Sequence, residues 1–212
     1  MTKIIQMKNS KLSDEIHKVF PLEPEIKKAL AHTNREAFVP TGLRHHAYKL
    51  DALPMSAQQW ISSPLTVAKM TQYLSPKGAD RVLEVGCGSG YQAAVLSHLF
   101  RGVFTIERIE PLLREAKERF RSLGIMNVHA RNDDGQNGWI QYAPYDRILF
   151  SASAQSIPTR LVEQLCEGGI LVAPVEINAK QVIMRYRKLN GKLIQERLDE
   201  CIFVPVLDGV QK

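Results

Sequence analysis

Hydrophobic and polar positions follow a regular alternation beyond Gly78. Short apolar runs of the kind that form buried strands alternate there with longer amphipathic stretches of helical period. The strand-like runs cover residues 81–86, 103–108, 127–132, 145–152 and 169–175. The helix-like stretches cover residues 91–100, 110–124 and 157–169. Alternation of this kind over about 100 residues predicts a parallel sheet with helices on both faces.

The two ends of the chain depart from this alternation. Residues 181–188 and the later run KLIQERL flank Asn190-Gly191, a pair typical of a two-residue hairpin turn. The first 34 residues form two short helical patterns interrupted at Pro21 and Pro24. We therefore expect an α/β fold, with a Rossmann-like, doubly wound and mostly parallel sheet, a C-terminal antiparallel hairpin and an N-terminal helical cap.

An irregular segment separates the N-terminal helices from the alternating region. It runs from Arg35 to Pro64 and is interrupted by prolines and a glycine, after which a helix is expected over residues 64–74. The segment ends in MSAQQWISSP, where the large indole of Trp60 stands among small hydroxyl side chains. This stretch has the composition of a substrate loop.

Composition indicates an ordinary globular protein. The chain has 212 residues, of which 44% are hydrophobic and 24% charged, enough for one well-buried core. We expect a single domain over residues 1–212, divided into a helical and loop region (1–75) and a ligand-binding core (76–212). No apolar run is long enough to span a membrane, and none near the N-terminus is typical of a secretory leader.

The cysteines and the net charge bear on the cellular location and the partners of the protein. Cys87, Cys166 and Cys201 match neither a disulfide framework nor a metal site, so we expect a cytoplasmic protein. The net charge of +6 is spread over the chain and mostly interleaved with acidic residues. We therefore expect no nucleic-acid partner and no membrane partner, and we expect a monomer.

The most informative motif is LEVGCGSGYQ, in which an expected strand leads through Gly86, Gly88 and Gly90 into an expected helix. Glycines permit a tight turn and close approach of a ligand to the backbone. A dinucleotide fingerprint would have its third glycine at the position of Tyr91. The spacing, with Glu84 before it, instead resembles motif I of the class I S-adenosylmethionine-dependent methyltransferases. We expect Glu84 and the three glycines to bind that cofactor; the alternative is a turn without a ligand.

Two further elements follow the next two strands. Glu107 ends the second strand, where a carboxylate can accept hydrogen bonds from both ribose hydroxyls of a nucleoside. After the third strand, Asp133 or Asp134 can bond an adenine amino group and Gly135 permits close packing. A surface acid and a plain Asx-Gly turn are the alternatives. Open α/β sheets bind ligands at the carboxyl ends of their strands, so these residues point to S-adenosylmethionine as cofactor.

With these residues in place, the chain resembles the protein-L-isoaspartate O-methyltransferase family. The matching blocks keep the family's order: REAFVP (35–40), AYKLDALP (47–54), QWISSP (59–64), VLEVGCGSGYQAAVLSHL (82–99), IER (106–108), PYDRILFSA (144–152), IPTRLVEQLCEGGILVAPV (157–175) and FVPV (203–206). The resemblance implies methylation of the α-carboxylate of L-isoaspartyl residues in damaged proteins and peptides, which would be the partners. The ester then collapses to a succinimide, which can reopen to aspartate.

The resemblance also implies roles for the segment before the helix at Pro64. The family's positioning serine falls on Ser62, whose hydroxyl would hold one acceptor carboxylate oxygen and aim the other at the methyl group. No general base is needed, because a carboxylate is already ionised at neutral pH. Without the resemblance, Ser62 is better explained as a helix N-cap. We expect Ile61 and Trp60 to contact the substrate.

Departures from the family concentrate in the same segment. Ser56 and Gln58 stand where glycines are usual, and Trp60 stands where threonine is usual; Asp133 and Glu176 also replace common glycines. These departures leave two alternatives open. The first is a related methyltransferase with a different carboxylate or small-molecule acceptor. The second is a cofactor-binding protein without isoaspartyl activity.

Overall fold

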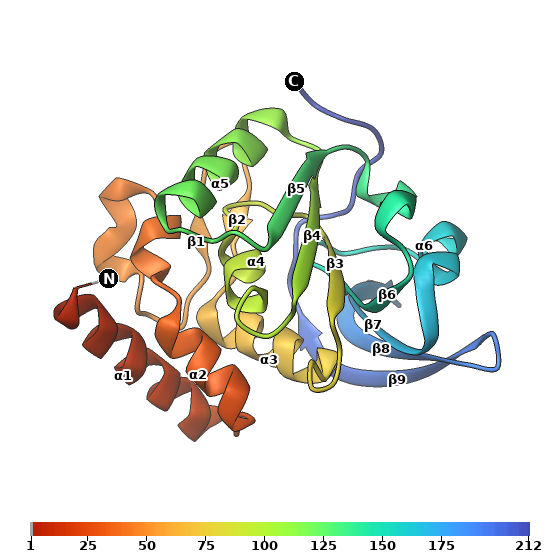
Figure 1. Cartoon of the computed structure of the whole chain (residues 1–212), viewed down its shortest axis with the longest axis horizontal. Helices are drawn as coiled ribbons and strands as arrows, with labels where there is room; N and C mark the ends of the chain where they lie inside the picture. The colour runs from red at the N-terminus through yellow and green to blue at the C-terminus, as the bar shows by residue number, and fades with distance from the viewer. Residues whose placement is uncertain (1) are drawn as a thin grey trace.

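The computed structural model, which describes residues 2–212, has a seven-stranded sheet at its centre, ordered β5-β4-β3-β6-β7-β8-β9 (Figure 1). Strands β3 to β7 are parallel, and β8 and β9 extend the sheet in antiparallel pairing. The strands are β3 Arg81–Val85, β4 Gly102–Glu107, β5 Val128–Asn132, β6 Tyr145–Phe150, β7 Leu165–Ile177, β8 Lys180–Leu189 and β9 Lys192–Cys201. The predicted α/β class, the mostly parallel sheet and the C-terminal hairpin are confirmed.

Helices cover both faces of this sheet. They are α1 Lys3–Val19, α2 Pro24–His32, α3 Pro64–Leu74, α4 Tyr91–Leu96, α5 Glu110–Ser122 and α6 Thr159–Gln164. Short 3-10 helices are η1 Arg35–Phe38, η2 Thr41–His46, η3 Gly135–Asn137 and η4 Ile140–Tyr142. Among residues 2–212, no helix combines the length and the apolar character that crossing a membrane requires.

Alternate residues of β3 contribute to two separate cores. Val82 belongs to a cluster with buried residues of α1 to α5, whereas Leu83 and Val85 belong to a cluster that includes Leu161 of α6. The cause is the pleat of a strand, whose successive side chains point to opposite faces of the sheet. Four of the five residues of β3 are buried, so the strand has no solvent-facing side. The cause is that helices cover both faces of the sheet.

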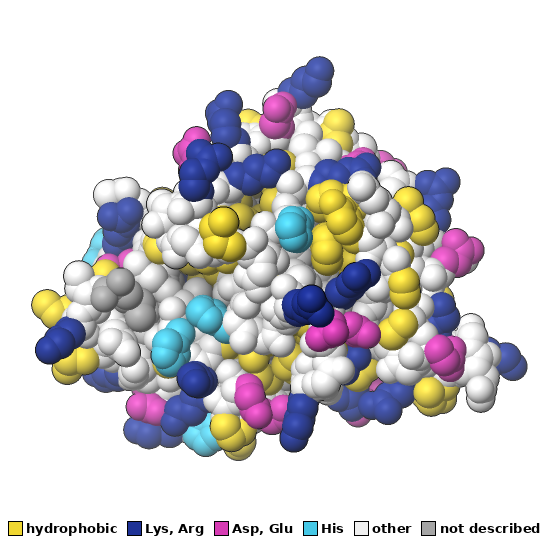
Figure 2. All heavy atoms as spheres, in the orientation of Figure 1, with side chains coloured by type: hydrophobic (Ala, Val, Ile, Leu, Met, Phe, Trp, Pro, Cys, Tyr) yellow, Lys and Arg dark blue, Asp and Glu magenta, His cyan; other side chains and the backbone are white. Residues whose placement is uncertain are grey.

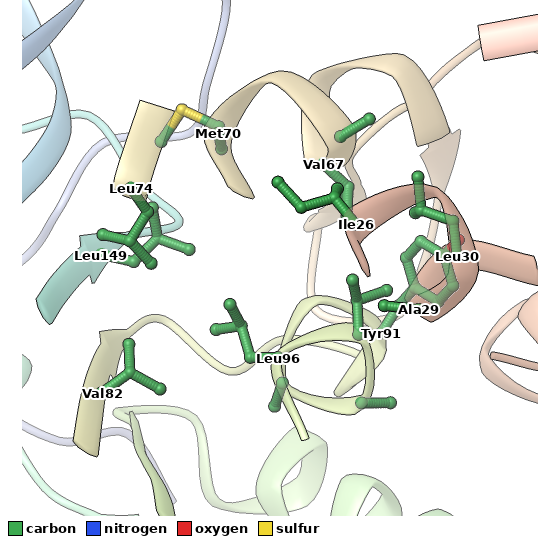
Figure 3. Packing of buried hydrophobic residues seen from close by; sticks show 14 of the residues in the cluster. Ile26, Ala29, Leu30, Val67, Met70, Leu74, Val82, Tyr91, Leu96 and Leu149 are labelled. Carbon is green, nitrogen blue, oxygen red and sulfur yellow. The ribbon is translucent and has the colours of Figure 1, made fainter. Parts of the chain in front are cut away.

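The N-terminal cap shares the first of these cores. Ile26 and Leu30 of α2 lie beside Val67 of α3 and Tyr91 of α4, as Figure 3 shows. All four side chains are buried, and burying an aliphatic side chain contributes about 1.5–3 kcal/mol to folding. The N-terminal helices are thus held by the same packing that holds the glycine loop before α4.

Gly90 lets α4 approach α5 closely. Its φ is +89°, and a Cβ on this residue would lie 2.7 Å from the Phe120 ring and 3.3 Å from Cβ of Ala116, both on α5. This third glycine therefore serves helix packing as well as the turn.

Two predicted helices are shorter than expected. The pattern predicts a helix over residues 91–100, but α4 ends at Leu96. The pattern predicts a helix over residues 157–169, but α6 ends at Gln164 and Leu165 already pairs with Tyr145 in the sheet. Lys188 of β8 donates hydrogen bonds to the carbonyl oxygens of Val162 and Leu165, at 2.8 and 2.7 Å. Pairing with β6, together with the side-chain hydrogen bonds from Lys188, thus overrides a local pattern that suits either conformation.

The segment LPMSAQQWI forms a small hairpin. Strands β1 Leu53–Pro54 and β2 Trp60–Ile61 pair antiparallel, and the Gln59 N–H donates to the Ser56 carbonyl at 3.2 Å. Both central turn residues, Ala57 and Gln58, have φ of +56°. Two consecutive left-handed residues match a type I′ turn, for which glycine is usual at the second position. Gln58 therefore adopts a backbone conformation that a glycine adopts without strain.

Candidate active site

Two adjoining pockets open at the carboxyl ends of the parallel strands. Pocket A is lined by Trp60, Ile61, Ser62, Thr66, Val67, Met70, Glu84, Gly86, Cys87, Gly88, Ser89, Tyr91, Gln92, Phe150, Ser151 and Phe203. Pocket B is lined by Gln59, Trp60, Val85, Gly86, Gly88, Ile106, Glu107, Arg108, Ile109, Leu112, Gly135, Ser151, Ala152, Val204, Pro205, Val206 and Leu207. In the sheet order, β4 lies on one side of β3 and β6 lies on the other, so the strand order reverses at β3. The carboxyl end of β3 is therefore a topological switch point, where sheets of this kind bind ligands.

The glycine loop forms the wall common to both pockets. Gly86 and Gly88 have φ of +94° and +52°, in the left-handed region that favours glycine. A Cβ on Gly88 would meet no atom within 4 Å, although the residue lines both pockets. The loop therefore offers open space beside its backbone, into which a side chain would protrude.

Glu107 lies at the end of β4 and lines pocket B. Its carboxylate accepts hydrogen bonds from the N–H groups of Gly88 at 2.8 Å and Ile109 at 2.9 Å. Burial raises the pKa of this carboxyl, and the backbone N–H groups oppose that rise. Each oxygen keeps a second acceptor site, because a carboxylate accepts about four hydrogen bonds. The group is thus fixed in direction and can still accept from a pair of ribose hydroxyls.

The loop after β5 contributes its backbone rather than its acids. Gly135 lines pocket B, and a Cβ there would lie 2.5 Å from Cγ1 of Val85. The Asp134 carboxylate instead accepts from the N–H groups of Gln136 and Gly209, both at 2.9 Å. Asp133 pairs with Arg131. Neither aspartate lines pocket A or pocket B, so only Gly135 of the three residues lies in the wall of these two pockets.

Glu84 is fully buried between two neighbouring strands and lines pocket A. Its carboxyl accepts from the hydroxyls of Thr105 at 2.6 Å and Ser151 at 3.0 Å. Burial raises the pKa of Glu84 to about 8, in spite of these hydrogen bonds, which lower it. The carboxyl is therefore mostly protonated at neutral pH.

Ser62 and Ser63 have separate roles. The Ser63 hydroxyl accepts from the N–H of Thr66 at 3.0 Å and caps α3. The alternative that Ser62 is the N-cap is therefore wrong. Ser62 lines pocket A, and within residues 2–212 its hydroxyl makes no hydrogen bond to another protein group. Ile61, buried on β2, lines the same pocket.

Trp60 stands at the junction of the pockets. It is 55% exposed and lines both pockets. Its neighbour Ile61 is buried because alternate residues of a strand face opposite sides. The indole thus presents a large apolar surface at the entrance to the space beside Ser62.

Several lining residues were not predicted from the sequence. Ser151 and Gln92 lie within sequence blocks that we noted, but neither has a motif of its own. The C-terminal segment 204–207 forms a wall of pocket B, and the chain just beyond it is bonded to the loops carrying Glu107 and Asp134. These bonds are Gly209 N–H to Asp134, Gln211 N–H to the Arg108 carbonyl, Gln136 to Asp208, and Arg108 to the carbonyls of Asp208 and Gly209.

The site fits the cofactor that the sequence indicates. The glycine loop provides a cradle that a Cβ would fill, a carboxylate with free acceptor sites lies beside it, and apolar side chains such as Leu112 and Val206 line the rest of pocket B. Together with the sheet order, these features define a class I methyltransferase that uses S-adenosylmethionine. More narrowly, the chain belongs to the protein-L-isoaspartate(D-aspartate) O-methyltransferase family, whose model matches residues 6–211.

Comparisons with individual proteins agree with this assignment. A protein-L-isoaspartate O-methyltransferase of Helicobacter pylori strain G27 is 59% identical over 206 residues, covering 97% of this chain and 99% of that one. One from Shewanella baltica strain OS195 is 40% identical over 209 residues, covering 99% of each. A solved protein-L-isoaspartate O-methyltransferase superposes with a TM-score of 0.86 at 26% identity, over 95% of this chain and 67% of that one.

A second solved structure shares the fold at lower identity. It is a Plasmodium falciparum protein in complex with S-adenosyl-L-homocysteine, with a TM-score of 0.84 at 22% identity. The match covers 94% of this chain and 98% of that one.

Substitution of Gly88 tests the cradle. We expect Gly88→Ala to weaken adenosylhomocysteine binding at least about tenfold, because the added Cβ enters the space beside the loop. Isothermal titration calorimetry measures this change. Gly124→Ala is the matched control, because Gly124 has φ of +68° and no atom within 4 Å of an added Cβ, but lines neither pocket. Equal affinities for the two variants would contradict the cradle.

Glu84 is expected to make stability depend on pH. Its pKa is raised in the folded state from 4.5 to about 8, so its stabilising contribution is complete below pH 4.5 and is lost as pH rises through 8. Relative to wild type, Glu84→Gln should therefore gain roughly 2–4 kcal/mol in unfolding free energy between pH 5 and pH 8.

Urea unfolding across this pH range measures the difference. The exposed Glu176→Gln serves as the matched substitution. Parallel profiles for Glu84→Gln and wild type would show that Glu84 ionises normally in the folded protein.

Proposed function

We propose that this chain repairs proteins by methylating the α-carboxylate of L-isoaspartyl residues, with Ser62 as the positioning residue. The observation that carries the proposal is the placement of the Ser62 hydroxyl. Ser62 lines pocket A beside the glycine loop, and within residues 2–212 its hydroxyl makes no hydrogen bond to another protein group. A hydroxyl in that position can donate to one oxygen of an acceptor carboxylate and leave the other oxygen directed toward the loop.

The chemistry requires positioning rather than proton transfer. S-adenosylmethionine supplies a methyl group on a positively charged sulfur. One acceptor oxygen forms a bond to that methyl carbon while the carbon–sulfur bond breaks, so a carboxylate and a sulfonium become a neutral ester and a neutral thioether. No proton is exchanged, which agrees with a mostly protonated Glu84 that does not act as a base. Orientation of the two reacting groups supplies the rate gain.

We also propose which residues hold the cofactor. Glu107 is assigned to the ribose, with Gly86 and Gly88 as the backbone cradle. Gly135 is assigned to the nucleoside wall. Glu84 is assigned to the methionine end, because it lines pocket A rather than pocket B. The other two predicted cofactor residues, Gly90 and Asp134, are assigned supporting roles.

Gly90 and Asp134 hold neighbouring chain segments in place. Gly90 keeps the loop in position by allowing α4 to pack on α5. Asp134 joins its own loop to the C-terminal segment through the Gly209 N–H. Both assignments are supported by contacts with neighbouring chain segments rather than by direct access to a pocket.

We propose the partners, the cellular location and the oligomeric state from features of the surface and the core. On the face that Figure 2 shows, Asp and Glu side chains lie among the Lys and Arg side chains, and ion pairs such as Lys27–Asp14 at 2.6 Å recur. This supports isoaspartyl proteins and peptides as partners, without nucleic acid or membrane. Three unpaired cysteines support a cytoplasmic location. The shared core of α2, α3 and α4 supports one domain, and we propose a monomer.

Methyl transfer to an isoaspartyl peptide tests the function directly. With labelled S-adenosylmethionine, we expect transfer to an isoaspartyl peptide and none to its aspartyl counterpart. Ser62→Ala should lower kcat/KM by about 10- to 100-fold, equal to about 1.4–2.7 kcal/mol of lost transition-state stabilisation.

Ser63→Ala is the matched control. It should lower the unfolding free energy by about 1 kcal/mol through loss of the helix cap, with kcat/KM nearly unchanged. Adenosylhomocysteine binding without isoaspartyl turnover would instead support one of the two alternatives, a different acceptor or a binding protein without catalysis. A panel of carboxylate acceptors distinguishes them.

Trp60 is proposed to contact the side chain next to the isoaspartyl residue. Its exposed indole lies at the junction of the pockets, and an aromatic contact contributes about 0.5–1.5 kcal/mol beyond area burial. We expect Trp60→Thr to raise KM about three- to tenfold for peptides with an aromatic residue beside isoaspartate, and little for glycine-flanked peptides. Steady-state kinetics measures both. An equal change for both peptides would refute the contact.

A further inference from the structure

Arg35 is the largest fully buried side chain of the described residues, with 0% of its surface exposed. It begins η1, directly after the helical cap. Within residues 2–212 it takes part in no ion pair. An arginine remains protonated in proteins, and burying a cation without an anion costs several kcal/mol. An apolar side chain in this position would avoid that cost, so the charge needs an explanation.

The guanidinium connects the two walls of pocket A. Its Nη2 donates to the main-chain carbonyl of Ser62 at 3.0 Å, and its Nε donates to the carbonyl of Ala47 at 2.8 Å. Its Cζ lies 4.5 Å from the centre of the Tyr91 ring. Ser62 and Tyr91 both line pocket A, but they belong to segments about 30 residues apart in sequence. Arg35 thus lies one layer behind the pocket wall and contacts both sides.

Pocket A has no positive side chain of its own. Its lining includes no lysine, arginine or histidine, and its one acidic group, Glu84, is mostly neutral at neutral pH. The proposed acceptor is a carboxylate and must leave water to enter this pocket. A buried cation just behind the wall stabilises such an anion more than a solvated surface cation does, because protein screens charge less than water.

We propose that Arg35 is a positioning residue of the acceptor site, which fixes Ser62 through its main-chain carbonyl and supplies positive potential for the acceptor carboxylate. This inference rests on the proposed function. The two contributions are separable. Hydrogen bonds from the planar guanidinium to the Ser62 and Ala47 carbonyls fix the main chain that carries the Ser62 hydroxyl, which affects kcat. The charge attracts the carboxylate and affects KM for the peptide.

Two substitutions separate these contributions. Arg35→Lys keeps the charge but loses the planar fork, so kcat should fall about tenfold with KM nearly unchanged. Arg35→Gln keeps a donor but loses the charge, so KM for the isoaspartyl peptide should rise about tenfold. In both variants, the Kd of adenosylhomocysteine should stay within about twofold of wild type, because neither hydrogen-bond partner of Arg35, Ala47 or Ser62, is assigned to the cofactor.

Arg147→Lys is the matched control. Arg147 is partly buried and also donates to main-chain carbonyls, to Ser75 and Asp146, both at 2.9 Å. Unlike the Arg35 partner Ser62, its partners Ser75 and Asp146 line neither pocket, so kcat and KM should be unchanged.

Each outcome decides the question. Unchanged kcat and KM in both Arg35 variants would refute the role of Arg35, as would kinetic changes no larger than those of Arg147→Lys. Failure of both variants to bind adenosylhomocysteine would assign Arg35 to folding and also overturn the proposal. Absence of turnover in the wild type would refute the proposed function itself, which distinguishes the two failures.

Discussion

The parallel pairing of β3 with both β4 and β6 is the constraint on which the site depends. It brings the glycine loop, Glu107 and Ser151 to one edge of the sheet, although about 65 residues separate the first from the last. Side-chain bonds follow the same register, because Glu84 accepts from Thr105 of β4 on one side and from Ser151 after β6 on the other. Helices on both faces bury this arrangement, which fixes the geometry and shifts the carboxyl pKa values.

The acceptor side of the site, around Ser62, is not positioned by the sheet. Residues around Ser62 belong to a short hairpin and an N-cap rather than to the sheet, so their positions depend on contacts from other parts of the chain. Ser63 caps α3, Ile61 is buried below the hairpin, and Arg35 holds the Ser62 carbonyl from inside the core. Three of the departures from the family's usual residues, Ser56, Gln58 and Trp60, are exposed on this hairpin and leave these inner contacts in place.

Local pattern predicted most of the elements, because their hydrophobic period is unambiguous. The helix over residues 64–74 and the strand from residue 81 agree with α3 and β3. The exceptions are the ends of α4 and α6. At the end of α6, LVEQLC suits helix or strand, and pairing of Leu165 with Tyr145 decides the outcome. Glycine spacing likewise located the loop, because only glycine adopts these turns without strain. The spacing could not show that Gly90 also permits packing against Phe120.

The amino-acid sequence by itself determined the fold class, the glycine loop and the carboxylate of Glu107, because each is set by a short run of residues with one favourable conformation. Only the tertiary structure decided which of two adjacent serines caps the helix and which lines the pocket. It alone showed that Asp134 bonds the C-terminal segment rather than lining pocket B, and that a buried arginine supports Ser62. These facts depend on contacts between segments far apart in the chain, which no local pattern records.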